Sequence, residues 1–292
     1  MSKSALGTAS GLAAAGIWGG RYVVSKVLLD IIPPFTLIAC RLLLGSLTLA
    51  AVLAWQHRTL LWGKHLWQIF GVGIIGYGIS LGFQFVGTKL STAANGSLVT
   101  CATPMFVLPI AWVILHERIT AARLVALIIS TIGVIAVLDP RDVGLNAQLF
   151  WGNLALLAAA LTWALYSVLV RFVSRDADIL TVSLVAFLGG LPIAIPVAVY
   201  ELTTVGIGRV NFGVILGVLF LGVIATALAM FLWNQAFALL EASRASLTFF
   251  AQPVVGALLG WHCLHETISP LFLLGGLLIA AGLIIVSRGS SP

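Results

Sequence analysis

Charged side chains are scarce in this sequence. Only 8% of its 292 residues are Asp, Glu, Lys or Arg and 61% are hydrophobic, whereas an average soluble domain is about 25% charged. A soluble fold of this length needs far more polar surface to cover its core. The scarcity therefore excludes a soluble globular protein and predicts an integral membrane protein whose apolar side chains face lipid.

Cysteine is rare as well. Cys40, Cys101 and Cys263 each stand inside an apolar stretch, without the spacing of a metal site or a disulfide framework. We interpret them as small buried hydrophobes and expect neither a metal nor a cofactor. The net charge of +6 does not indicate nucleic acid, because no basic run is longer than two residues.

Long hydrophobic runs dominate what remains. A spanning helix needs about 20 mostly apolar residues, and turn or charged residues separate ten such runs. The predicted spans are 5–28, 34–55, 66–87, 92–115, 121–138, 149–173, 179–200, 211–239, 243–264 and 270–287. The fold class is therefore all-α integral membrane, with connections too short for a soluble domain.

The cations of the connections predict the orientation. With the N-terminus inside, nine cations fall on the inner side, namely Lys3, Arg58, Lys64, Arg118, Arg123, Arg171, Arg175, Arg244 and Arg288, and three fall on the outer side, namely Lys89, Arg141 and Arg209. Positive charge collects on the cytoplasmic side of membrane proteins. We expect both termini to be cytoplasmic, in a bacterial inner membrane.

The two halves of the chain repeat each other. Residues 91–120 and 240–269 share ten identities in thirty ungapped positions, among them Pro104/Pro253 and Glu117/Glu266. Trp18/Trp163 match at a shift of 145. Five spans in each half is an odd number, so the second copy enters the membrane inverted. Inverted repeats are typical of alternating-access carriers, although a duplicated scaffold without transport is the alternative.

The same residues resemble a known group. Trp18-Gly19-Gly20, Pro33-Pro34 with Arg41, and Thr92-Ala93-Ala94 leading to Pro104 and Glu117-Arg118 are similar to the drug/metabolite transporter superfamily in its EamA-type branch. Ala242-Ser243, Pro253 and Leu264-His265-Glu266 repeat the last of these patterns. Within the superfamily the chain is similar to the YddG-type amino-acid exporters, although Arg21 stands where a small polar residue is expected.

The resemblance implies two five-helix repeats, 1–143 and 144–292, around a central cavity lined by the first, third, fourth, sixth, eighth and ninth helices. It implies a small-molecule substrate, amino acids among the candidates. The lipid bilayer is the other partner, and the oligomeric state is open, with a monomer sufficient.

Three cations stand at or within predicted spans: Arg21, Lys26 and Arg41. A charge in mid-membrane is costly, so each should face protein or water. Arg21 lies one helical turn after Trp18, and a cation beside an indole suits an amino-acid carboxylate and an apolar side chain. For Arg41 we favour a structural clamp between helices over an anion contact. Lys26 is either an interfacial anchor or a gate.

Other mid-span residues are candidates for the cavity wall. The predicted set comprises Trp18, Arg21, Tyr77, Phe83, Asn95, Trp163, Tyr166, Trp233, Ser246 and Gln252. The alternative for any one aromatic residue is packing or contact with lipid. Pro104 and Pro253 remove a backbone donor at equivalent depths and predict hinges in two helices.

The nine carboxylates avoid the middle of every predicted span. Proton-coupled carriers usually place Asp or Glu there, so the sequence favours facilitated diffusion. Glu117 and Glu266 follow equivalent helices, and we interpret them as structural locks of the turn, with a gate latch as the alternative. His262 is interpreted as a packing residue.

The function that these features favour is the export or facilitated diffusion of amino acids, aromatic or apolar ones first, or of similar metabolites. A multidrug or other metabolite exporter of the same superfamily is the alternative, and a structural membrane subunit is the alternative without transport. An enzyme is disfavoured, because no catalytic constellation stands within a span.

Overall fold

The structure is a computed structural model that describes residues 2–57, 64–117, 119–138, 147–173, 178–265 and 270–288. Within these ranges the chain is helical, without a strand. The elements in chain order are α1 (Lys3–Leu29), α2 (Pro34–Trp55), α3 (Lys64–Gly73), η1 (Ile74–Ser80), α4 (Leu81–Leu90), α5 (Ala93–Val99), η2 (Thr100–Ala102), α6 (Thr103–Leu115), α7 (Ala121–Leu138), α8 (Ala147–Val173), α9 (Ile179–Thr204), α10 (Phe212–Leu219), η5 (Phe220–Leu228), α11 (Ala229–Leu239), α12 (Ala242–Leu247), η6 (Thr248–Phe250), α13 (Ala251–Leu264) and α14 (Pro270–Arg288).

Every stretch predicted as a span is helical where the structure describes it, apart from the N-cap residues Thr92 and Asn211 at the start of two of them. Seven of these helical runs in the described residues are long and apolar enough to cross a membrane, and shorter apolar helices cover 121–133 and 273–282. The first helix, α1, is not among the seven, because glycine, serine and two cations interrupt its apolar residues. Ten spans therefore stay a prediction, whereas a multi-pass helical membrane protein is established.

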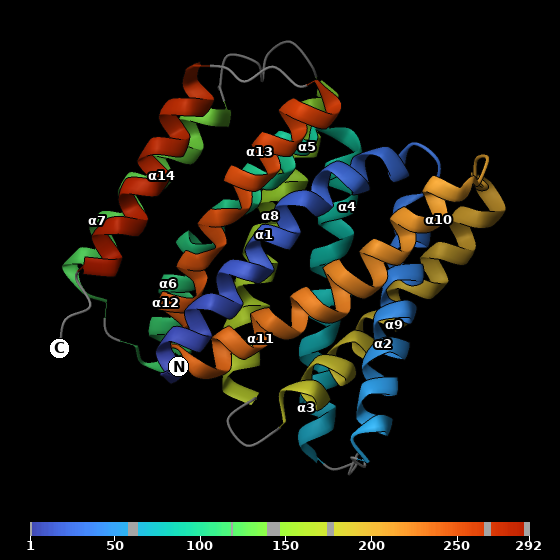
Figure 1. Ribbon diagram of the computed structural model, residues 1–292, viewed down its shortest axis with the longest axis horizontal. Helices are drawn as coiled ribbons and strands as arrows, with labels where there is room; N and C mark the ends of the chain where they lie inside the picture. Colours follow the sequence, from blue (N-terminus) through green and yellow to red (C-terminus); the bar gives the residue numbers. More distant parts are fainter. Residues whose placement is uncertain are drawn as a thin grey trace.

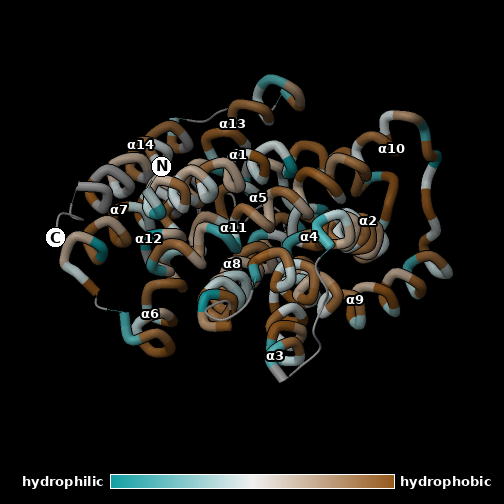
Figure 2. Tube along the Cα trace, turned by 60° about the horizontal axis from the view of Figure 1, so that its bottom comes forward, coloured by the Kyte–Doolittle hydropathy of each residue, from teal (hydrophilic) through white to brown (hydrophobic). Residues whose placement is uncertain are grey.

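The helices form a central group flanked by two sides. Figure 1 shows α7 and α14 lying along each other at one side and α2, α9 and α10 at the other, with α1, α8, α11 and α13 between them. Both termini lie towards the same end of the molecule. Hydrophobic colour dominates peripheral helices such as α9 and α10 in Figure 2, while hydrophilic positions appear along α4, α8 and α11. Polar side chains therefore gather in the interior.

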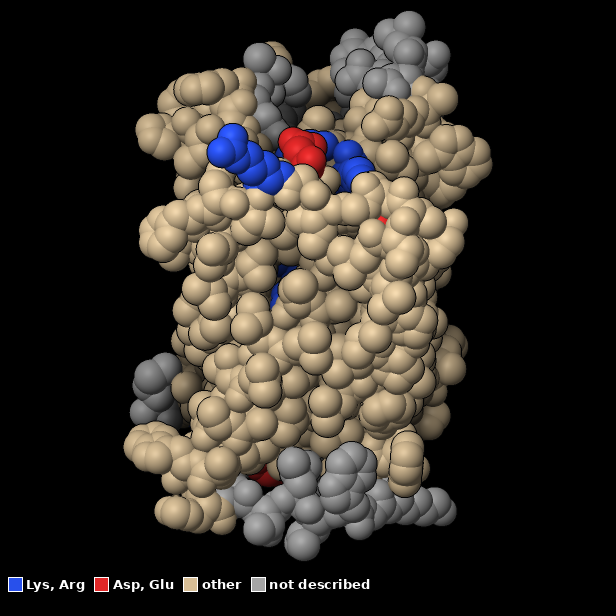
Figure 3. All heavy atoms as spheres, turned by 90° about the vertical axis from the view of Figure 1, so that its right-hand side faces the viewer, with Lys and Arg blue, Asp and Glu red and all other residues tan. Residues whose placement is uncertain are grey.

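The outer surface carries its charges away from the middle. On the face in Figure 3, Lys, Arg, Asp and Glu gather near one end, and a wide uncharged band lies below them. At mid-height a Lys or Arg side chain is visible only at the bottom of a hollow. A band of apolar surface between charged ends is the pattern that a bilayer requires.

Two helix ends show how local sequence sets the elements. Glu201 of α9 accepts hydrogen bonds from the backbone N–H groups of Phe35 (3.1 Å) and Thr36 (2.7 Å) at the start of α2. A carboxylate at a helix N-terminus is favourable, because unpaired N–H groups and the helix dipole face it. At their C-termini, α6 and α13 end at the caps His116 and His265, whose backbones are both in the left-handed conformation with φ 54°.

Four helical runs change their winding near the middle of the molecule. Two contain the π-helical segments η1 and η5, and two contain the 3₁₀ segments η2 and η6, which directly precede the turns with Pro104 and Pro253. A proline frees the carbonyl four residues earlier. The freed carbonyl of Thr100 accepts from Thr103 Oγ1 at 2.6 Å, and that of Phe249 accepts from Cys101 Sγ at 3.6 Å. Irregular backbone at this depth is tolerated because protein groups satisfy it.

Candidate functional site

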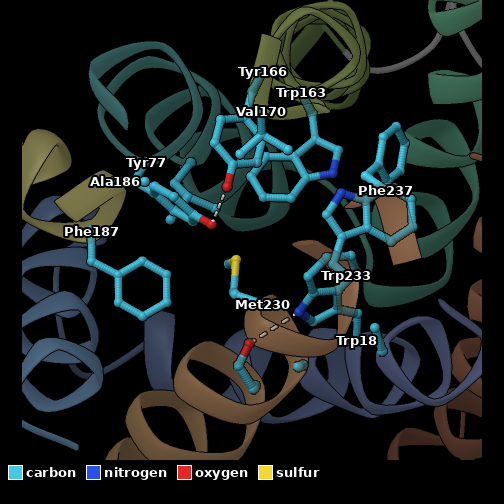
Figure 4. Packing of buried hydrophobic residues seen from close by; sticks show 14 of the residues in the cluster. Trp18, Tyr77, Trp163, Tyr166, Val170, Ala186, Phe187, Met230, Trp233 and Phe237 are labelled. Atoms are coloured by element: carbon cyan, nitrogen blue, oxygen red, sulfur yellow. Dashed lines mark hydrogen bonds between the residues drawn. The ribbon is translucent and has the colours of Figure 1, made fainter. Parts of the chain in front are cut away.

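An aromatic cluster lies where the central helices meet. Trp18 of α1 meets Trp163 of α8 edge to face, with ring centroids 5.6 Å apart, and it approaches Trp233 of α11 at 5.3 Å. Phe249 of η6 closes the group at 5.7 Å from Trp18 and 5.1 Å from Trp233. Figure 4 shows the three indoles converging from different helices. Edge-to-face and tilted pairs at these separations are attractive beyond simple burial.

The three indole N–H groups differ in their partners. Trp18 Nε1 donates to the carbonyl of Ala225 in η5 at 3.0 Å, and Trp233 Nε1 donates to Ser167 Oγ at 3.1 Å. Trp163 Nε1 is buried and has no acceptor among the described residues. A buried donor without a partner is costly, so Trp163 holds an unused hydrogen-bonding group at the centre of the cluster.

A small cavity opens beside this cluster. It measures about 10 Å³ and is lined by Trp18, Arg21, Leu81, Gln84, Trp163 and Phe249. A cavity of that size holds about one water molecule. A metabolite is therefore too large for this cavity unless the helices move apart.

Two larger cavities have less suitable walls. One, of about 200 Å³, lies between η2, α6, α7 and α8, and its lining is almost entirely apolar. The other, of about 380 Å³, lies at the ends of α6 and α8 among His116, Glu117, Arg123, Arg171 and Glu241. Of these three cavities in the described part of the chain, the small central one alone combines aromatic faces, a cation and an amide, and we take it as the candidate site.

Two guanidinium groups are buried near the centre. Arg41 is fully buried, and it donates from Nε to Thr226 Oγ1 (2.8 Å) and from Nη2 to the carbonyl of Ala225 (3.5 Å). Arg21 is 3% exposed, with its guanidinium carbon 4.8 Å from the ring centroid of Tyr22. Arg41 thus connects α2 with η5, while Arg21 forms part of the cavity wall.

A hydrogen-bond network lies next to Arg21. Gln84 Nε2 donates to Tyr22 Oη (2.7 Å), which is 2.8 Å from Thr100 Oγ1, and Thr100 Oγ1 donates to the carbonyl of Gly96 (2.8 Å). Gln252 Nε2 also reaches Thr100 Oγ1, at 2.8 Å. The network joins α1, α4, η2 and α13, so it closes the cavity on the Arg21 side.

A second network lies on the other side of the indoles. Tyr77 and Tyr166 share a hydrogen bond of 2.6 Å between their hydroxyls (Figure 4), and Tyr166 Oη donates to Asn234 Oδ1 at 2.9 Å. Asn234 Nδ2 then donates to Ser183 Oγ at 2.9 Å. Gly76 allows this approach, because a Cβ there would stand 2.3 Å from the Tyr166 ring.

Two cations hold helix ends at opposite ends of the bundle. Lys26 Nζ donates to the carbonyls of Lys89 (3.1 Å) and Ser91 at the end of α4. Arg171 Nη1 donates to the carbonyls of Phe237 (2.6 Å) and Leu240 at the end of α11. Cations are favourable at helix C-termini, where unpaired carbonyls concentrate.

Charged groups also join the segments around Arg171. Glu117 Oε1 accepts from the backbone N–H of Ala242 at 2.7 Å and lies 3.5 Å from Arg171 Nε. Arg123 pairs with Glu241 at the same end. Glu117 therefore bonds the backbone N–H of the first residue of α12 (Ala242–Leu247) and a cation at the end of α8. The matching Glu266 lies outside the described residues.

The structure brings together most of the predicted cavity residues, but not all of them. Trp18, Arg21 and Trp163 line the cavity, and Tyr77, Tyr166, Trp233 and Gln252 lie in the cluster or its two networks. Ser246 is buried. Phe83 is 42% exposed and is not in the cluster, and Asn95 lies in the first turn of α5 with its backbone N–H bonded to Thr92 Oγ1.

Four residues of the site are not among those selected from the sequence. Leu81, Gln84 and Phe249 line the cavity, and Tyr22 connects Gln84 to Thr100. A polar side chain inside an apolar stretch is the signal that marks Gln84 and Tyr22. Phe249 carries no comparable signal, since phenylalanine is ordinary in a membrane helix. No group of three or more potential metal ligands gathers among the described residues.

Known proteins resemble this chain along its whole length. An uncharacterized transporter, YoaV of Bacillus subtilis, is 26% identical over 274 residues, covering 91% of each chain. A probable amino-acid metabolite efflux pump of Salmonella typhimurium is 28% identical over 280 residues, covering 92% of this chain and 90% of the relative. A solved crystal structure superposes with a TM-score of 0.79 at 22% identity, over 99% of this chain and all of the other, which shows a common fold.

The family profile gives the assignment. The profile of the EamA-like transporter family matches residues 5–138 and matches again over residues 150–288. The two matches together cover nearly the whole chain, and the seven apolar helices of the described residues agree with a membrane transporter. The chain belongs to the EamA-like transporter family.

Proposed function

We propose that this protein exports amino acids, or lets them diffuse down their gradient, by alternating access through the central cavity, and that aromatic and apolar amino acids are its preferred substrates. The observation that carries the proposal is the cavity itself, in which indole faces and a guanidinium line one closed space. An amino acid offers an apolar side chain to the indoles and a carboxylate to the cation. The name of the Salmonella relative, a probable amino-acid metabolite efflux pump, supports the same substrate class.

The proposed architecture is two inverted five-helix repeats, 1–143 and 144–292. Matching contacts at the two ends support it. Lys26 and Arg171 each stand 21 residues after the start of a profile match, and each holds the end of a helix, α4 or α11. The π-helical segments η1 and η5 precede those two helices. Two copies of one fold with opposite direction can exchange shapes, and this exchange moves the opening from one face to the other.

The two networks beside the indoles supply the closures that alternating access requires. The Tyr22 network closes the Arg21 side, and the Tyr77–Tyr166–Asn234 network closes the other. Both networks are intact in the structure. Opening one face then requires one network to break while the other holds, and the cation bias of the connections places the Arg171 end in the cytoplasm.

The test is flux of radiolabelled amino acids into liposomes that contain the purified protein. We expect saturable uptake of tryptophan or phenylalanine, and competition by unlabelled apolar amino acids. Trp163→Ala should reduce this flux strongly, while Trp261→Ala, at an exposed position, serves as the matched control. Flux of other metabolites but of no amino acid would contradict the substrate class, and an absence of any solute flux would favour a structural membrane subunit.

A further inference from the structure

Positive charge at the centre of the protein has no matching negative charge in the described residues. Arg21 and Arg41 are both buried, and they are close enough to repel each other. The ion pairs that the structure describes, Arg123–Glu241 and Arg171–Glu117, lie at one end of the bundle. A buried cation without a counter-ion is strongly unfavourable, so a negative group of a ligand gains free energy by binding here.

Arg21 is the cation that a ligand can reach. Arg41 bonds Thr226 and Ala225 and contacts the ring of Phe85, and although its Nη1 has no partner among the described residues, Arg41 does not line the cavity. Arg21 lines the cavity instead, and the contacts of its guanidinium plane are the rings of Trp18 and Tyr22. Arg21 also hydrogen-bonds Tyr22, and its remaining N–H donors are left for a carboxylate. The unpartnered Trp163 Nε1 is a further donor in the same wall.

The same region holds acceptors without donors. Gln84 Oε1 and Gln252 Oε1 are buried and have no hydrogen-bond partner in the described part of the chain. The donor and acceptor order of the hydrogen bonds determines which end of each amide, Nε2 or Oε1, faces the network. Thr100 gives its hydroxyl proton to the Gly96 carbonyl, so Tyr22 Oη donates to Thr100 and Gln84 approaches Tyr22 through its Nε2.

The orientation of Gln252 follows in the same way. Its Nε2 lies 2.8 Å from the carbonyl of Ser97, which can only accept a hydrogen bond. The oxygens of both amides are therefore left without a donor, and Gln84 lines the cavity together with Arg21. An ammonium group, which carries three donors and no acceptor, is the partner that such oxygens lack.

We infer that the cavity selects zwitterions by charge: the α-carboxylate of the solute binds Arg21 and Trp163 Nε1, and its α-ammonium binds Gln84 Oε1, with Gln252 Oε1 behind it. The side chain then lies among Trp18, Trp163 and Phe249. This inference rests on the proposed function and sharpens it, because it makes Arg21 and Gln84 the residues that determine specificity. An amine without a carboxylate leaves Arg21 without a counter-charge and is repelled by it, so it does not bind.

The experiment compares three indole compounds as competitors of radiolabelled tryptophan flux in proteoliposomes. Tryptophan carries both charged groups, indole-3-propionate lacks the ammonium, and tryptamine lacks the carboxylate. We expect competition to fall in that order, with no competition by tryptamine. Arg21→Gln should raise the half-saturating tryptophan concentration about tenfold or more, the value of a charge-assisted hydrogen bond. The exposed Arg209→Gln is the control and should change nothing.

A variant that acquires a new substrate shows that the altered selectivity does not come from poor folding. Gln84→Glu places a carboxylate beside Arg21, so it should abolish competition by indole-3-propionate and admit tryptamine, in a variant that elutes as a single species. Tryptophan flux with equal competition by tryptamine, and with no effect of Arg21→Gln, would overturn this inference while the proposed function stands. If none of the three compounds is transported or competes, the proposed function itself fails for aromatic amino acids.

Discussion

Trp18 and Trp163 meet edge to face at the centre of the protein, with ring planes at 83°, although 145 positions separate them in the sequence. Each stands 13 residues after the first residue of a family-profile match. The two residues are thus matching positions of the two halves, and they touch where the proposed symmetry axis would pass. Trp163 packs against Tyr77 and Tyr166 of one network and lines the cavity together with Gln84 of the other, which suits a substrate site that must serve both faces.

The two indoles should respond differently to substitution. Trp18→Phe removes the hydrogen bond to Ala225, which is worth about 0.5–1.5 kcal/mol, whereas Trp163→Phe removes no hydrogen bond of the described structure. We expect Trp18→Phe to lower the melting temperature in detergent more than Trp163→Phe. Trp163→Phe should instead reduce tryptophan flux. If the two variants have equal melting temperatures and Trp163→Phe leaves tryptophan flux unchanged, the N–H of Trp163 is not part of the substrate site.

Gly76 is one of the positions where space is most limiting. A Cβ there stands 2.3 Å from Tyr166 Cδ2, so Gly76→Ala should displace the Tyr166 ring and break its hydrogen bonds to Tyr77 and Asn234. Overpacking of this kind costs about 1–3 kcal/mol. Gly71→Ala, in α3 of the same helical run, is the control, because nothing lies within 4 Å of its added Cβ. Thermal unfolding in detergent should separate the two variants, and equal stability would contradict the packing at Tyr166.

Glu117 should matter for stability and not for selectivity. Glu117→Gln weakens the contact to Arg171 and reduces the charge that faces the N–H of Ala242. We therefore expect a lower melting temperature in detergent, by the loss of roughly 1–3 kcal/mol for a hydrogen bond to a charged group, with the competition profile of the transported amino acids unchanged. An altered profile in a protein of normal stability would reassign Glu117 to a gate.

The sequence predicts the helical stretches of this protein closely, and it predicts less of the site. The predicted span 34–55 has the same bounds as α2, and the predicted span 179–200 begins with α9 but ends four residues before it, because polar residues mark the ends of spans only approximately. The π-helical segments η1 and η5 were not predicted, since their winding depends on tertiary contacts and not on residue type.

The inward face of each helix was harder to predict for a physical reason. A helix in lipid is apolar on both faces, so it lacks the amphipathic stripe that marks the buried side in a soluble protein. Phe83 was selected and Gln84 was overlooked, although they are adjacent. One residue is about 100° of rotation on a helix, which is enough to place Phe83 42% exposed and Gln84 in the cavity wall.

The pair Arg123–Glu241 distinguishes one end of the bundle from the other. In the repeat, the matching positions are Thr92 and Phe272, and neither is charged. This ion pair is partly exposed, with Glu241 half accessible, so salt should weaken it. We expect tryptophan exchange by the native protein to accelerate in high salt, because this end then opens more readily. The Glu241→Gln variant should exchange tryptophan rapidly even at low salt, and its rate should not change with salt. The double variant Arg123→Glu/Glu241→Arg should restore the salt dependence of the native exchange rate.

Transport should not depend on a proton gradient. The carboxylates that the structure describes, Asp30, Glu117, Asp178, Glu201 and Glu241, all lie at or beyond helix ends, away from the indole cluster. A proton-coupled carrier needs a titratable group that the substrate site and both faces reach in turn, and Arg21 does not serve because a guanidinium holds its proton. Imposing a gradient of about one pH unit across proteoliposomes should therefore leave tryptophan flux unchanged within about twofold, and a protonophore should have no further effect. If flux instead follows the gradient and collapses with the protonophore, a group other than these five carboxylates must carry the proton, and facilitated diffusion is the wrong mechanism for this member of the family.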